Sequence, residues 1–147
     1  MKVSPRLKIS IHVSFSLLYA SGLLYFIFDR FIKIQTSLGT ENNPNSHAVL
    51  EVHAIVGLWF IALMGYMLRA HIEPGWRVNR NRGSGLGLFI PFLILCATVP
   101  GLYYLADERM RAGTAFVHTY LGLAAILPLL FHLWAAKRTR RRLLKRV

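Results

Sequence analysis

Histidines are the side chains in this sequence with the greatest capacity for chemistry. Four of the six fall inside long apolar segments: His12, His53, His118 and His132. A buried ionisable group is costly in a membrane, so an intramembrane histidine usually serves a redox, metal or proton-transfer function. The chain has one cysteine, which excludes a disulfide framework and any cysteine-based zinc or iron–sulfur cage. The predicted chemistry therefore depends on imidazole.

The spacing of these histidines predicts two sites at different depths. His118 and His132 are separated by 14 positions, close to four helical turns, so they share one helix face. Along the helix axis this spacing corresponds to about 21 Å. His53 lies near the start of its apolar segment, as His118 does, and both segments cross in the same direction, so these two histidines share a depth. Imidazoles at two depths suit two stacked b haems between the helices of a bundle.

A local pattern around two of the histidines supports haem ligation. His53 and His118 both stand in the pattern V-H-x-x-x-G-L, which places Gly57 and Gly122 four residues after them. Residues four apart share a helix face, and a missing side chain there leaves space for a flat macrocycle. The alternative is that both glycines make ordinary small-residue helix contacts. The sequence has no C-x-x-C-H motif, so both haems are expected to be non-covalent.

The elements that carry the histidines are predicted to be four membrane-spanning helices. The apolar segments cover residues of about 9–28, 52–68, 84–106 and 112–136, and 54% of the chain is hydrophobic. Each is near the roughly 20 residues that a helix needs to cross a bilayer, and backbone polar groups in lipid must be satisfied within the segment. The predicted fold is an all-α membrane protein, a four-helix bundle forming one domain over residues 1–147.

The distribution of charge predicts the orientation of this bundle. The net charge is +12, from 18 Lys and Arg against 6 Asp and Glu. Most basic residues lie in the N-terminal tail, in the link after the second helix and in the tail 137–147. The positive-inside rule therefore places both termini of this multi-pass protein in the cytoplasm, and the expected location is the cytoplasmic membrane of a bacterium or archaeon. The basic tail has no aromatic platform, so it is expected to face anionic lipid rather than nucleic acid.

Several of these features together resemble a known family. They are the basic loop after the second helix, the H-x13-H spacing in the fourth, the run Arg69-Ala70-His71-Ile72-Glu73-Pro74 and the run Asn81-Arg82-Gly83. The chain resembles the membrane cytochrome b (gamma) subunit of respiratory formate dehydrogenases and the related b-type cytochromes of nickel–iron hydrogenases. The resemblance covers most of the sequence.

The resemblance implies a haem-ligand set. An outer haem would lie between His53 and His118, and an inner haem between His12 and His132. The family has His-Trp preceded by an arginine in its first helix, whereas His12 is followed by Val13. His71 is therefore the alternative ligand of the inner haem, although His12 matches the depth of His132 better.

The resemblance also implies a quinone site on the cytoplasmic side. Asn81 and Gly83 would line a pocket for menaquinone or ubiquinone, and His71 would relay protons, because the charge of a histidine can change near neutral pH. The alternative for Asn81 and Gly83 is a turn and helix cap.

The predicted function is transmembrane electron transfer between an outer-side redox partner and the quinone pool. The partner would be an iron–sulfur or multihaem subunit with its own catalytic subunit, so this chain would be the membrane anchor of an oxidoreductase complex. Three other functions stay open: a stand-alone electron carrier or ferric reductase, a haem-free transporter that uses the histidines as a relay, and a purely structural anchor.

Overall fold

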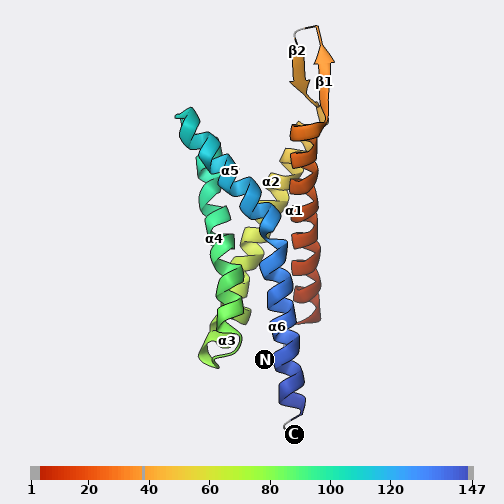
Figure 1. The fold of residues 1–147 in the computed structure, drawn as a ribbon. Helices are drawn as coiled ribbons and strands as arrows, with labels where there is room; N and C mark the ends of the chain where they lie inside the picture. The colour runs from red at the N-terminus through yellow and green to blue at the C-terminus, as the bar shows by residue number, and fades with distance from the viewer. Residues whose placement is uncertain (1–3, 38, 146–147) are drawn as a thin grey trace. The chain divides into compact units, whose positions relative to one another are not determined.

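The computed structural model describes residues 4–37 and 39–145, and helices dominate it (Figure 1). The helices are α1 (Pro5–Phe31), α2 (Asn45–Met67), the π-helix η1 (Leu68–Ile72), α3 (Glu73–Arg77), α4 (Arg82–Tyr104), α5 (Glu108–Ala124) and α6 (Ile126–Leu144). Strands β1 (Lys33–Thr36) and β2 (Gly39–Asn42) form an antiparallel hairpin between α1 and α2, with Lys33 opposite Asn42. The predicted elements did not include this hairpin.

Four helical stretches are long and apolar enough to cross a membrane, which confirms the predicted number of spans. They are Pro5–Phe31, Asn45–Arg77, Arg82–Tyr104 and Glu108–Arg142. Three of them extend well beyond the predicted apolar runs, because helical hydrogen bonding continues through polar residues that a hydropathy boundary excludes. The basic segment predicted as a tail from residue 137 is helical as far as Leu144, the last residue of α6.

The chain divides into two compact units, residues 1–67 and 68–147. In the first unit, α1 and α2 pack against each other as an antiparallel hairpin (Figure 1). The Oγ of Ser4 accepts a hydrogen bond from the Leu7 amide and caps α1, while Pro5 occupies the first turn, where its missing N–H costs nothing.

In the second unit, α4 packs against α5 and α6. The Asp107 carboxylate accepts a hydrogen bond from the Met110 amide and caps α5. Helices α5 and α6 together form one span, interrupted at Ala125. Pro128 lies just beyond this interruption and has no N–H to donate to the carbonyl of Ala124, which accounts for the break.

Small residues fill the interior, and large apolar side chains face outwards. Apart from Phe60, the buried residues of the described part of the chain are serines: Ser14, Ser21, Ser46 and Ser84. Leu58 is 69% exposed and Ile55 68% exposed, although both lie in the middle of an apolar span. Close approach through small residues with an apolar exterior is typical of helices that pack within lipid. The fold is therefore that of a multi-pass helical membrane protein.

The span that begins with α2 changes its winding near its end. Pro74 lies inside this span, where its ring would clash with the carbonyl group of Ala70, four residues earlier. The turn before Pro74 is η1, a π-helix that contains Ala70 and His71. A π-turn is wider than an α-turn and relieves such a clash, and it also rotates the following side chains about the helix axis.

Candidate functional site

Three of the intramembrane histidines share one arrangement. In each, the imidazole Nδ1 lies within hydrogen-bond distance of a hydroxyl oxygen on a neighbouring helix of the same unit. The pairs are His53 with Ser21 at 3.1 Å, His132 with Ser84 at 3.1 Å and His118 with Thr98 at 2.7 Å.

The second hydrogen bond of each hydroxyl determines which way the proton points. The hydroxyl donates to the backbone carbonyl three residues earlier in its own helix, as Ser21 does to Leu18 at 3.0 Å and Thr98 does to Leu95 at 2.7 Å. Ser84 likewise donates to the carbonyl of Asn81 at 3.2 Å. A hydroxyl has one proton to donate, so a hydroxyl that gives it to the carbonyl accepts from Nδ1–H of the imidazole.

The tautomer that follows is the metal-binding one. For His53 a second contact confirms it, since Nδ1 lies 3.1 Å from the Leu18 carbonyl oxygen, which can only accept. With the proton on Nδ1, the lone pair of the neutral imidazole is on Nε2. Ligating histidines almost always donate their other ring N–H in this way, which sets both tautomer and ring orientation.

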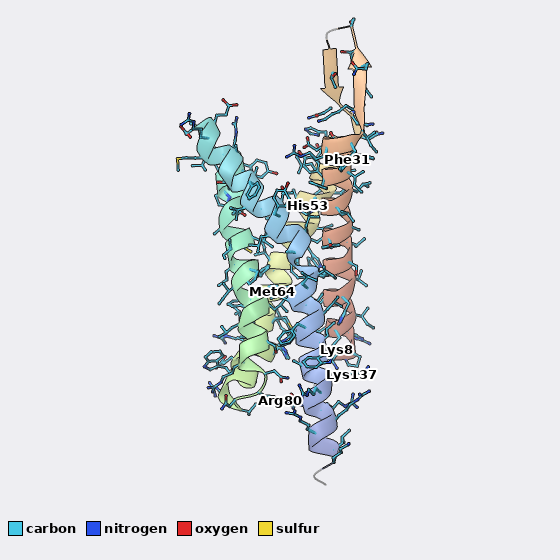
Figure 2. All side chains as sticks on the ribbon, viewed as in Figure 1. Lys8, Phe31, His53, Met64, Arg80 and Lys137 are labelled. Atoms are coloured by element: carbon cyan, nitrogen blue, oxygen red, sulfur yellow. The ribbon has the colours of Figure 1, made fainter. Side chains whose placement is uncertain are left out.

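The ring of His53 also packs directly on the backbone of α1. A Cβ atom placed on Gly22 would lie 2.9 Å from Cε1 of His53, closer than side chains tolerate. In Figure 2, His53 lies between Phe31, at the end of α1, and Met64, further along α2. Ser21 and Gly22 thus act together, one bonding the imidazole and the other making room for it.

The glycines of the V-H-x-x-x-G-L pattern have other neighbours. A Cβ on Gly57 would lie 3.6 Å from Cδ1 of Leu18, and one on Gly122 would lie 3.9 Å from Cδ2 of Leu95. Both distances are ordinary van der Waals contacts. The predicted role of Gly57 and Gly122 beside a macrocycle stays a prediction.

His12 differs from the other three intramembrane histidines. Its side chain is exposed, and its Nδ1–H donates to the carbonyl of Lys8 in its own helix at 2.6 Å. His71, also exposed, lies on η1 with its ring centre 6.2 Å from that of His132 and the two ring planes 85° apart. The structure therefore brings His71 to one of the predicted ligands within a single unit. The predicted pairs His53–His118 and His12–His132 each join the two units and stay predictions.

The predicted quinone residues lie where α4 begins. Asn81 has the left-handed backbone conformation, with φ of 54°, at the N-cap position, but its side chain does not cap the helix. Its Oδ1 instead accepts a hydrogen bond from Thr139 of α6 at 2.7 Å. A Cβ on Gly83 would meet nothing within 4 Å. The Arg82 guanidinium lies over the Trp76 ring, 4.9 Å from its centroid, and so connects α4 to α3.

Sequence reasoning missed the residues that hold the imidazoles: Ser21, Ser84, Thr98 and Gly22. A signal existed, because a Ser-Gly pair occurs at positions 21–22 and again at 84–85, each in an apolar helix. In the structure the first pair adjoins His53. The second adjoins His132, whose Cε1 would lie 4.0 Å from a Cβ on Gly85.

The donor set restricts the metal group that could bind. Among the described residues, no cluster of three or more His, Cys, Asp or Glu side chains could enclose a bare ion. Paired imidazoles suit haem iron, because the porphyrin supplies the four remaining ligands. Comparison with protein-family models, with curated proteins and with solved structures gives no match.

Proposed function

We propose that this chain is a membrane cytochrome b that binds two haems and carries electrons between an outer-side redox partner and quinone. The observation that carries the proposal is the shared environment of His53, His118 and His132, in which each Nδ1 lies within hydrogen-bond distance of a hydroxyl oxygen on another helix. When that hydroxyl oxygen accepts the Nδ1–H of the imidazole, the lone pair of the ring is on Nε2, where iron would bind. Ligating histidines almost always have their other ring nitrogen held by such a partner, and the same arrangement occurs here at three histidines.

The residues of this chain supply ligation, orientation and exclusion of water. A b haem held by two of these imidazoles would supply one-electron transfer. Ser21, Ser84 and Thr98 restrain the rings, so that little reorganisation accompanies a change in charge. The apolar spans around the rings lower the local dielectric constant, and burial of this kind tunes reduction potential.

The basic side of the chain supports the quinone part of the proposal. The N-terminal tail, residues 69–82 and the end of α6 carry the arginines and lysines that the positive-inside rule assigns to the cytoplasm. In Figure 2, Arg80 lies in the link between α3 and α4, and the part of α6 beyond Lys137 is crowded with nitrogen-bearing side chains. Quinone reduction there would take protons from the cytoplasm, with the amide nitrogen of Asn81 as a donor to a quinone carbonyl.

The test is the haem content of the purified full-length chain, expressed in a haem-replete host. We expect two non-covalent haems b per chain in a pyridine haemochrome assay. His118→Ala and His132→Ala should each remove one haem, and the retained haem should differ in absorption spectrum between the two variants. His47→Ala is the matched control, because His47 is exposed and pairs with Glu51 at 3.1 Å. A haem-free chain, or full haem content in both ligand variants, would refute the proposal.

A further inference from the structure

The second unit contains two histidines placed opposite each other on different helices. His71 lies on η1 and His132 on α6, with ring centres 6.2 Å apart and ring planes 85° apart. Ser84 Oγ lies 3.1 Å from Nδ1 of His132, and when this hydroxyl oxygen accepts Nδ1–H the lone pair of the ring is on Nε2, the atom that would bind a metal.

The separation of these rings matches that of two imidazoles sharing one metal ion. An imidazole nitrogen binds a first-row metal at about 2.0 Å, so two rings on opposite sides of one ion have centres about 6 Å apart. In such an arrangement both ring planes contain the N–metal–N axis, and the angle between the planes is unrestricted. The 85° angle between the planes of His71 and His132 is therefore compatible with binding to one metal ion, and parallel ring planes would be equally compatible.

The backbone around His71 departs from regular α-helical winding. His71 lies in the π-helical turn that precedes Pro74. Short π-helical turns inside longer helices occur frequently at functional sites, because the inserted residue redirects the side chains that follow it. Here the π-helical turn carries His71, whose ring centre lies 6.2 Å from that of His132.

From these observations we infer that His71, and not His12, is the second ligand of the haem bound by His132. One complete bis-imidazole site then lies within residues 68–147, and His12 is not a ligand. The inference rests on the proposed function and specifies its inner site. It departs from the ligand set that the family resemblance implies, in which the first helix supplies this histidine. It also replaces the predicted role of His71 as a proton relay.

The test compares His71→Ala with His12→Ala in the full-length chain. We expect His71→Ala to retain one haem, as His132→Ala does, and His12→Ala to retain two. The haem ascribed to His118 serves as an internal control for folding. Two haems in His71→Ala, or one in His12→Ala, would overturn the inference. A haem-free unaltered chain would overturn the proposed function as well, so the two failures are distinguishable.

Two further measurements separate ligation from a proton-relay role. Imidazole added to His71→Ala should restore the low-spin bis-imidazole spectrum, because it can occupy the vacated axial position. His71→Met should retain the haem and raise its midpoint potential, since a thioether ligand favours the ferrous state. A proton relay predicts neither effect, so unchanged spectra and potentials in both variants would contradict ligation by His71.

Discussion

The Oγ1 of Thr98 lies 2.7 Å from Nδ1 of His118, and the same oxygen lies 2.7 Å from the carbonyl oxygen of Leu95. When the hydroxyl donates to the carbonyl, the imidazole donates to the hydroxyl oxygen. A single threonine thus sets the tautomer of His118 and fixes the rotation of its ring about the Cβ–Cγ bond.

Replacing Thr98 by valine tests this relationship, because valine has the same shape without the hydroxyl. We expect haem retention at His118 to fall about tenfold or more, the usual effect of losing a hydrogen-bond partner of a metal ligand. Thr98→Ser keeps the hydroxyl and should retain the haem. Haem titration of the apoprotein measures the change, and equal affinity in the valine and serine variants would contradict the assigned role.

Replacing Gly22 by alanine should displace the ring of His53. The new Cβ would lie 2.9 Å from Cε1, and the ring cannot withdraw without lengthening its bonds to Ser21 and Leu18. We expect the haem ascribed to His53 to be lost or reduced by about tenfold in affinity. Gly65→Ala is the matched control, since its Cβ would meet nothing within 4 Å. Identical haem spectra in the two variants would count against this packing.

Alanine substitutions at two glycines of α4 should change the free energy of unfolding in opposite directions, because only Gly101 lies against a side chain of α5. A Cβ on Gly101 would lie 2.8 Å from Cγ2 of Thr114, whose hydroxyl is bonded to the Met110 carbonyl. Overpacking of this kind costs about 1–3 kcal/mol in the free energy of unfolding. Gly87→Ala has open space and should stabilise by up to about 1 kcal/mol. Denaturant titration in detergent measures both, and a Gly101→Ala variant as stable as the unaltered chain would refute the prediction.

The role of Asn81 can be separated from that of its hydrogen bond. Thr139→Val removes only the donor to Asn81 Oδ1, whereas Asn81→Ala also removes the amide nitrogen that would serve a quinone. We expect quinone-linked turnover to fall about tenfold in Asn81→Ala, with intact haem spectra, and to change little in Thr139→Val. Equal losses of quinone-linked turnover in the two variants would show that Asn81 acts only through its hydrogen bond with Thr139 of α6.

The sequence by itself determined the helices and the positions of the imidazoles along them. Charge-free apolar runs of sufficient length predicted four spans, because a backbone in lipid must satisfy its own hydrogen bonds. The same reasoning ended three of the four spans too early, since polar residues such as those after Lys137 continue the hydrogen-bonded helix without adding apolar length. The β-hairpin between α1 and α2 carries no apolar alternation that would have predicted it.

Tertiary structure decided which side chain each imidazole contacts. Membrane helices that are apolar all round have no amphipathic stripe to set their rotation, so spacing along one helix cannot identify partners on another. Ser21, Ser84 and Thr98 became partners because small residues allow close helix approach at those depths. His71 came next to His132 because Pro74 disfavours regular α-winding and the π-turn before it redirects the chain.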